Sequence, residues 1–126
     1  MSNNSYQSKQ QELDKIAQEI RDFKGLEIAK NCINAVPGEG DPDAKIMFIG
    51  EAPGADEDTI GRPFVGRSGQ LLRQTITESN IKIYKVFITN IVKYRPPENR
   101  DPLPEEIEIC RDWLNRQIQI IEPATI

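Results

Sequence analysis

Two short, uninterrupted apolar runs, each followed by a polar loop, restrict the fold more than any other feature of the sequence. Residues 46–49 (IMFI) lead into residues 50–54 (GEAPG), and residues 86–88 (VFI) lead into Thr89 and Asn90. Short apolar runs bounded by turn residues are typical of strands buried on both faces of a parallel sheet. Because residues of helical periodicity separate the two runs, a right-handed crossover and helices on both faces of the sheet are expected.

Three segments with helical periodicity surround these strands. The first covers residues 8–23 and follows a polar stretch, residues 1–7, that we expect to be frayed. The second starts with Ser68 as its N-cap, and the third starts at Pro104 and ends before Pro123. The apolar positions that define these helices are Leu13, Ile16, Ala17, Ile20 and Phe23, then Leu71, Leu72 and Ile76, then Ile107, Cys110, Leu114, Ile118 and Ile121.

The order of these elements predicts an α/β fold, a three-layer α/β/α sandwich with a short parallel sheet. The length of 126 residues fits a single domain, residues 1–126. Residues 124–126 begin another apolar segment that stops at once, so we expect the sheet to be incomplete at the C-terminus and the domain to be truncated.

Composition excludes several classes of protein. The net charge of −4 argues against a polybasic nucleic-acid binder, although a local basic patch remains compatible with it. No apolar run approaches the roughly 20 residues of a membrane span, and no signal peptide is present. Cys32 and Cys110 lie far apart and form no CxxC pair, which favours a soluble protein in the reducing cytoplasm.

The loops that follow the two strands carry the candidate chemistry, because ligands bind at the carboxyl ends of strands in such sheets. Residues 50–58 combine glycines with acids, and residues 61–69 (GRPFVGRSG) place an aromatic ring between two arginines. Arginines contact phosphates and an aromatic ring stacks on a base, whereas an amide such as Asn90 presents a donor and an acceptor to a base edge. Each feature also has an ordinary alternative: a solvated acidic turn, a loop anchored in the core by Phe64, an asparagine that caps a turn, and a solvated basic loop over residues 93–100.

The order of these motifs resembles the iron–sulfur-type (family 4) uracil-DNA glycosylases. The matching stretches are residues 35–40 (AVPGEG), 50–58 (GEAPGADED), 61–69 (GRPFVGRSG), 88–90 (ITN) and 95–100 (RPPENR). The resemblance implies hydrolysis of the N-glycosidic bond of deoxyuridine in DNA, within base-excision repair. Such an enzyme must flip the base out of the helix into a pocket with a stacking face and an edge reader.

By position, the resemblance assigns roles to residues of this chain. Glu51 and Glu57 match the functional acids, and which of them handles the water is left open. Phe64 matches the aromatic residue that stacks on uracil, Asn90 matches the amide that reads its edge, and Gly50 and Ala52 belong to the same pocket. The expected DNA-binding patch consists of Arg62, Arg67, Lys93, Arg95 and Arg100.

Two departures from the family affect these expectations. The positions of three of the four cluster cysteines hold Phe23, Leu26 and Tyr94, so that only Cys110 remains and we expect no iron–sulfur cluster and no other cofactor. Cys32 lies near the first pair but out of register. The substitutes are apolar or aromatic, and we expect them to pack together in place of the cluster.

The chain also contains no histidine, whereas the family uses one to face the charge that develops on the uracil oxygen. Losing such a donor costs on the order of a hundredfold or more in rate. We therefore expect little activity from these 126 residues alone, and a monomer when the domain is completed. A non-catalytic module that binds uracil-containing DNA or a repair partner is the alternative. A generic nucleotide-binding domain is disfavoured because no P-loop or dinucleotide glycine pattern follows the first strand.

Overall fold

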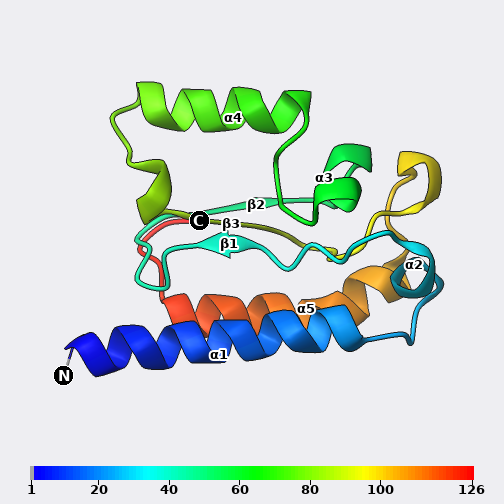
Figure 1. Ribbon diagram of the computed structural model, residues 1–126, viewed down its shortest axis with the longest axis horizontal. Helices are drawn as coiled ribbons and strands as arrows, with labels where there is room; N and C mark the ends of the chain where they lie inside the picture. Colours follow the sequence, from blue (N-terminus) through cyan, green and yellow to red (C-terminus); the bar gives the residue numbers. More distant parts are fainter. Residues whose placement is uncertain (1) are drawn as a thin grey trace.

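A small mixed sheet forms the middle layer of the computed structural model, which describes residues 2–126 (Figure 1). Strands β2 (Met47–Gly50) and β3 (Phe87–Asn90) run parallel, with Met47 opposite Phe87 and Gly50 opposite Asn90. This pairing confirms the two strands that the apolar runs predict. Since both strands end at the same level, the loops that follow them emerge side by side.

The sheet also contains a short strand that the sequence did not indicate. β1 (Glu39–Gly40) pairs antiparallel with β3, in the order β1-β3-β2, so the sheet is mixed rather than purely parallel. A Cβ atom at Gly40 would lie 2.1 Å from the carbonyl oxygen of Val86. Gly40 therefore allows the close approach of two backbones.

The last residues of the chain pair with the opposite edge of the sheet. Thr125 forms a parallel bridge with Ile46, and the backbone N–H of Met47 donates to the carbonyl of Thr125 at 3.0 Å. Residues 124–126 therefore extend the backbone pairing at the β2 edge of the sheet.

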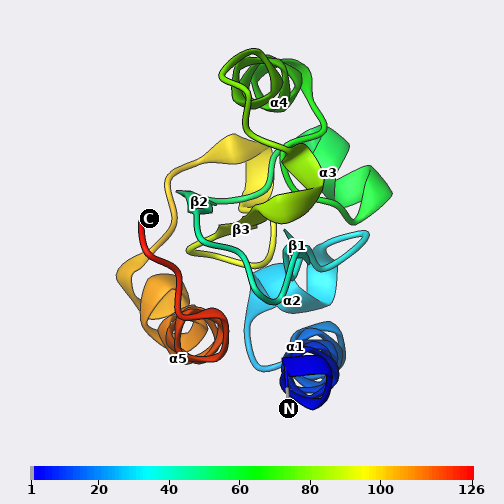
Figure 2. The same ribbon diagram turned by 90° about the vertical axis from the view of Figure 1, so that its left-hand side faces the viewer.

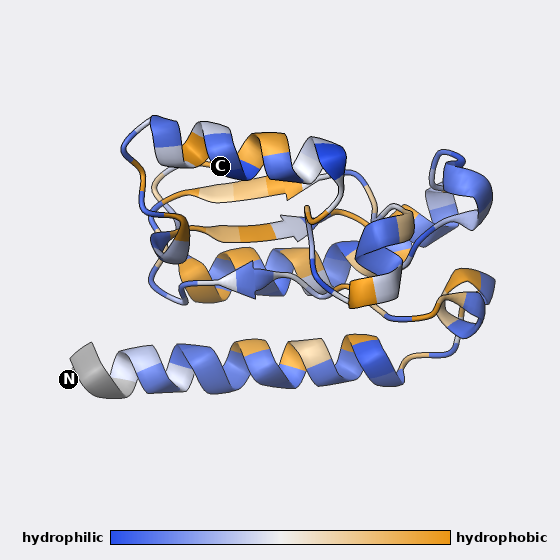
Figure 3. Cartoon of the chain, turned by 45° about the horizontal axis from the view of Figure 1, so that its top comes forward, coloured by the Kyte–Doolittle hydropathy of each residue, from blue (hydrophilic) through white to orange (hydrophobic). Residues whose placement is uncertain are grey.

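Helices α1 (Ser2–Asp22) and α5 (Pro104–Ile121) lie side by side and antiparallel on one face of the sheet (Figures 1 and 2). The apolar stripe of α1 faces the rest of the fold, and its outer surface is hydrophilic (Figure 3). The helix begins at Ser2 rather than at residue 8, while Met1 lies outside the described residues. No glycine or proline interrupts residues 2–22, and nothing therefore stops the helix at residue 8.

The buried face of α5 differs from the predicted one. Cys110 and Ile121 are buried as expected, but Ile107, Leu114 and Ile118 are only partly buried. The remaining buried positions are Glu106, Trp113 and Gln117. The spacing of apolar residues did not predict this face, because two polar side chains, Glu106 and Gln117, are buried with hydrogen-bond partners outside the helix.

Helix α4 (Arg67–Glu78) covers the other face of the sheet, which completes the three layers (Figure 2). Its N-cap is Gly66 rather than Ser68, and Leu71 is 64% exposed. Two short helices, α2 (Glu27–Asn31) and α3 (Ala55–Ile60), and single 3-10 turns at Ile83–Lys85 and Pro97–Asn99 complete the fold. α3 replaces part of the long polar loop that we expected after Gly54.

Candidate functional site

A small open pocket of about 140 Å³ lies at the carboxyl ends of β2 and β3. Its lining combines residues from the loop after β2, from the end of β3 and from the first turn of α4, so the positive end of that helix dipole lies at the pocket. The lining residues are Ala52, Glu57, Phe64, Ser68, Gly69 and Asn90. Three of the four residues expected to bind uracil, Ala52, Phe64 and Asn90, thus line one pocket.

Gly50 sits between the aromatic ring and the amide of this pocket. A Cβ atom placed there would lie 2.5 Å from Cζ of Phe64 and 2.5 Å from Oδ1 of Asn90. Any larger residue would therefore displace one of the two groups. The glycine of the GEAPG motif is explained by this close approach.

The side-chain amide of Asn90 is available for a ligand. The residue is only 3% exposed, yet its amide makes no hydrogen bond with any residue that the structure describes. It does not cap a turn, which was the ordinary alternative for this position. Its backbone carbonyl accepts a hydrogen bond from Nζ of Lys93 at 2.7 Å, so the end of β3 is held in place.

Phe64 adopts a backbone conformation that bulky residues rarely take, with φ of 52°. The side chain is partly exposed at the pocket and does not belong to either buried hydrophobic cluster. Gly69 permits this arrangement, because a Cβ atom there would lie 2.1 Å from the carbonyl carbon of Phe64. Strained residues of this kind concentrate at functional sites.

Glu57 holds the loop that carries Phe64. Its Oε1 accepts from the N–H of Gly54 at 3.0 Å, and its Oε2 accepts from the N–H groups of Val65 at 2.9 Å and Gly66 at 2.7 Å. Partial burial raises the pKa of Glu57, but the hydrogen bonds from these backbone groups outweigh it, and the pKa lies below its ordinary value. The carboxylate is ionised at neutral pH and fully occupied by the backbone.

Glu51, the other expected acid, lies outside the lining of the pocket. Its side chain is exposed and forms no hydrogen bond or ion pair with any residue in the described part of the chain. Its backbone carbonyl accepts from the N–H of Val92 at 3.0 Å, which fixes the loop beside the end of β3. Of the two acids, Glu51 has its carboxylate free.

The expected DNA-binding patch divides into three groups. Arg62 donates to both carboxylate oxygens of Glu39 at 2.8 and 2.7 Å, and Arg100 donates to both oxygens of Glu106 at 2.9 Å. The charges of these two arginines are therefore already paired. Arg67 is exposed and has no ion pair among the described residues, and Arg95 donates only to the neutral amide of Asn99.

Lys93 forms the third group, and its expected DNA contact is wrong. The residue is completely buried, and its Nζ donates to Oγ1 of Thr89 at 2.6 Å, to the carbonyl of Asn90, and to Oε1 of Gln117 at 2.8 Å. Burial lowers its pKa to about 7. A lysine in a loop motif is usually solvated, and only the tertiary structure reveals that this one supports the end of β3.

The positions of the family's cluster ligands form an apolar core instead of a metal site. Rings of Phe23, Tyr94 and Trp113, which we name the aromatic cluster, have centroids 5.3 to 6.4 Å apart. Leu26 and Cys110 pack in the same buried cluster, and the hydroxyl of Tyr94 donates to the carbonyl of Ile20 at 2.7 Å. The four ligand positions offer a single sulfur donor, so these residues do not fit an iron–sulfur cluster.

Three residues near the pocket carry interactions that the sequence did not suggest. Arg73 of α4 donates to the backbone of the Phe64 loop, Glu39 of β1 binds both Arg62 and Arg73, and Gln117 of α5 bridges Lys93 and the carbonyl of Pro37. The position of Gln117, four residues before Ile121 and on the same helical face, could have indicated burial. No signal in the sequence singles out Arg73.

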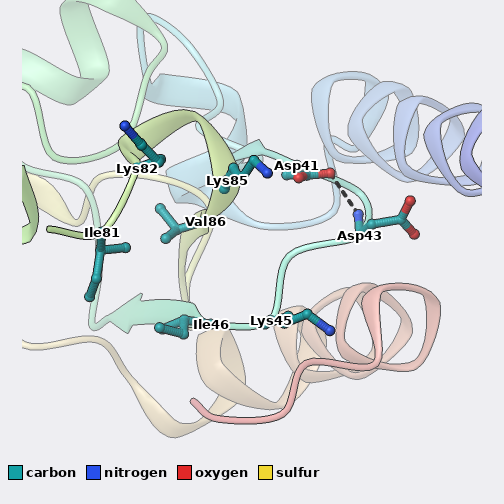
Figure 4. A pocket seen from close by; sticks show the side chains of 8 residues that line it. All are labelled: Asp41, Asp43, Lys45, Ile46, Ile81, Lys82, Lys85 and Val86. Atoms are coloured by element: carbon teal, nitrogen blue, oxygen red, sulfur yellow. Dashed lines mark hydrogen bonds between the residues drawn. The ribbon is translucent and has the colours of Figure 1, made fainter.

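A larger pocket of about 390 Å³ lies at the opposite ends of the strands (Figure 4). Ile46, Ile81 and Val86 are among its lining residues, together with lysines and two aspartates of the neighbouring loops. Asp41 accepts a hydrogen bond from the backbone of Asp43, which is paired with Lys9. Since this pocket lies at the amino ends of the strands, it is not where the motif residues converge. Among residues 2–126, no helix has the length and apolarity to cross a membrane.

Comparison with known proteins identifies the family of the chain. Residues 37–126 match the family described as the uracil DNA glycosylase superfamily. A type-4 uracil-DNA glycosylase of Sulfurisphaera tokodaii is 53% identical over 115 residues, which cover 90% of this chain and 52% of that protein. That of Archaeoglobus fulgidus is 47% identical over 114 residues, covering 90% of this chain and 57% of that protein.

A type-4 uracil-DNA glycosylase of Thermotoga maritima is 45% identical over 111 residues, covering 88% of this chain and 58% of that protein. The chain thus spans little more than half the length of these curated relatives. The matched region includes both strands, the pocket and the residues that position it. The family match and these identities together show that the chain belongs to the uracil DNA glycosylase superfamily, in its type-4 branch.

Proposed function

We propose that this chain forms the base-recognition half of a uracil-DNA glycosylase, which hydrolyses the N-glycosidic bond of deoxyuridine in DNA. One observation carries the proposal: the unpartnered amide of Asn90 lies beside the ring of Phe64 in a pocket at the carboxyl end of the sheet. A flipped uracil needs both groups, one to stack on its face and one to pair with its polar edge.

In this proposal, the other residues in and beside the pocket have different roles. Gly50 and Ala52 let the base approach the backbone closely. The free carboxylate of Glu51 stabilises the cationic sugar of the transition state or orients the attacking water. Glu57 acts at a distance from the sugar, as the group that fixes the loop of Phe64. Of the two acids, we therefore propose Glu51 as the one that handles the water.

DNA contact comes from the cations that have no internal acidic partner. Arg67 and Arg95 bind phosphates beside the pocket, whereas Arg62 and Arg100 contribute less because Glu39 and Glu106 already neutralise them. The negative charge that develops on the leaving uracil meets Asn90 and the positive end of α4, because both lie at the pocket.

A cleavage assay on a labelled single-stranded oligonucleotide with one uracil tests the proposal. We expect excision that falls on the order of a hundredfold in Asn90→Ala and Glu51→Gln. The matched control is Asn115→Ala, because Asn115 is exposed on α5 away from the pocket. Measurable excision by the unaltered protein that Asn90→Ala leaves unchanged would refute the role of this pocket.

A second function, a non-catalytic module that binds uracil-containing DNA, would use the same base-binding groups, Phe64 and Asn90. The two functions separate when binding and excision are measured on the same oligonucleotide. Binding that prefers uracil to cytosine and depends on Asn90, without excision, supports the module. Excision supports the enzyme, and lack of both removes the pocket assignment.

We further propose that the protein works without an iron–sulfur cluster, as a monomer in the cytoplasm. Its support is the aromatic cluster, which fills the space with Phe23 and Tyr94 where thiolate ligands are needed. Cys32 and Cys110 are both unpaired, which suits a reducing compartment. Protein purified without oxygen is expected to be colourless. Stoichiometric iron and sulfide with absorbance near about 400 nm, as cysteine-ligated clusters show, would contradict this.

A further inference from the structure

The loop that presents Phe64 is held by two side chains of opposite charge. Glu57 accepts hydrogen bonds from the N–H groups of Val65 and Gly66, which follow the ring. On the other side, Arg73 donates from Nε to the carbonyl of Phe64 at 2.8 Å and from Nη2 to the carbonyl of Pro63 at 2.7 Å. An anion thus holds the amides of the loop and a cation holds its carbonyls.

These two sets of hydrogen bonds matter because the backbone of Phe64 is strained. Its φ of 52° lies in the left-handed region, which a bulky side chain leaves unless the surroundings hold it there. The two carbonyls that Arg73 binds are those on either side of this dihedral angle. Without those bonds the residue is free to relax towards an ordinary conformation, and the ring moves with it.

Arg73 is itself held by the sheet. Its side chain is 23% exposed, and its Nη2 lies 3.4 Å from Oε2 of Glu39, a residue of β1 that also binds Arg62 at 2.7 Å. Glu39 pairs in register with Ile88 of β3, two residues before Asn90. One chain of contacts therefore links the strand that carries the edge-reading amide to the loop that carries the stacking ring.

We propose that Arg73, supported by Glu39, is a positioning residue for base recognition, because it sets the ring of Phe64 at the correct place relative to the amide of Asn90. The proposal rests on the proposed function for what the pocket recognises, but the positioning of the ring can be tested separately. Arg73 does not line the pocket and acts only through the loop.

The first measurement is independent of any activity. Cζ of Phe64 lies so close to Gly50 that a Cβ there would be 2.5 Å away, so nuclear Overhauser contacts between the ring and the α-protons of Gly50 are expected in the unaltered protein. In Arg73→Gln these contacts should disappear while those within α1 and α5 persist. Unchanged contacts between the ring and Gly50 would overturn the proposal, whatever the protein does with DNA.

The second measurement compares binding of single-stranded oligonucleotides with uracil or cytosine at one position. A misplaced ring holds the base out of register with the edge-reading amide of Asn90, so Arg73→Gln should lower the preference for uracil about three- to tenfold. The slope of affinity against salt should stay unchanged, because Arg73 contacts no phosphate in this proposal. The matched control Arg67→Gln, on the same helix but exposed, should lower the salt slope and keep the preference.

A double-mutant cycle separates positioning from general destabilisation. In a Phe64→Ala background, Arg73→Gln should cause no further loss of preference, because its effect passes through the missing ring. An equal loss in both backgrounds would overturn the proposal. If Arg73→Gln does not fold, Arg73→Lys replaces it, since one ammonium cannot match two carbonyls as a guanidinium does, and an intermediate loss is expected. Lack of any uracil preference in the unaltered protein would reject the proposed function, and the ring contacts would still decide the role of Arg73.

Discussion

The pocket around Asn90 and the aromatic cluster around Tyr94 lie next to each other along the chain, yet different forces shape them. The pocket depends on directed bonds: Glu57 and Arg73 bind individual backbone groups, and glycines leave room for close approach. The cluster depends on filled volume, with Phe23 and Trp113 packed against Tyr94. The pocket therefore depends on particular hydrogen-bond partners, whereas the cluster depends only on the volume that its side chains fill.

A hydrogen bond is lost when either partner is replaced, and the remaining partner is then buried without a hydrogen bond, which destabilises the fold. Packed apolar groups, in contrast, accept other residues of suitable total volume. This difference is compatible with the proposal that Phe23, Leu26 and Tyr94 fill, by packing, the positions that the resemblance assigns to cluster ligands.

Removing the ring of Tyr94 should have the largest effect. Tyr94 is 1% exposed, and Tyr94→Ala should lower the free energy of unfolding by about 3–5 kcal/mol, the usual loss for a buried aromatic residue. Tyr84→Ala is the control, because Tyr84 is 68% exposed and should lose less than about 0.5 kcal/mol. Urea unfolding measures both. Similar values for the two variants would mean that the aromatic cluster does not stabilise the fold.

Neutralising Glu57 should have an intermediate effect and should depend on pH. Glu57→Gln weakens three bonds from backbone N–H groups to a charged acceptor, with an expected loss of about 1–3 kcal/mol at neutral pH. Glu12→Gln, at an exposed position of α1, is the control. Thermal unfolding should show the loss for Glu57→Gln and little change for Glu12→Gln.

The sign of the pH dependence follows from the lowered pKa of Glu57 in the folded protein. The stabilisation by its carboxylate is fully present above the ordinary pKa of 4.5 and is lost as the pH falls through the lower, folded pKa. The difference in melting temperature between Glu57→Gln and the unaltered protein should therefore shrink as the pH falls below 4.5 and through the folded pKa. A difference that stays constant down to pH of about 3 would show that the charge does not contribute.

Replacing the free cations beside the pocket should have the smallest effect. For single-stranded DNA, each phosphate contact contributes about 0.7 to the slope of log affinity against log salt, so Arg67→Gln with Arg95→Gln should lower the slope by about 1.4. Folding stability should hardly change, since neither side chain forms an ion pair among the described residues. Arg111→Gln on α5 is the control. An unchanged slope in the double variant would place the DNA elsewhere on the surface.

The sequence alone was sufficient for the framework and for much of the pocket. Apolar runs with period and length typical of strands and helices predicted β2, β3, α4 and α5, because burial of apolar area depends mainly on that pattern. Placing the two loops at the carboxyl ends of parallel strands was enough to bring Phe64 and Asn90 together. The sequence also predicted that Phe23, Leu26 and Tyr94 pack together, because apolar and aromatic side chains are buried with one another.

Tertiary structure alone decided the partners of the polar and charged groups. Lys93 is buried against Thr89 and Gln117 rather than exposed to DNA, Arg62 is neutralised by Glu39, and the carboxylate of Glu57 accepts hydrogen bonds from backbone N–H groups. The short strand β1 likewise depends on a backbone partner far along the chain, because Glu39 and Gly40 pair with Ile88 and Phe87. A charged side chain carries no mark of its partner, because hydrogen bonds form between groups far apart in sequence that only the folded chain brings within 3 Å or so of each other.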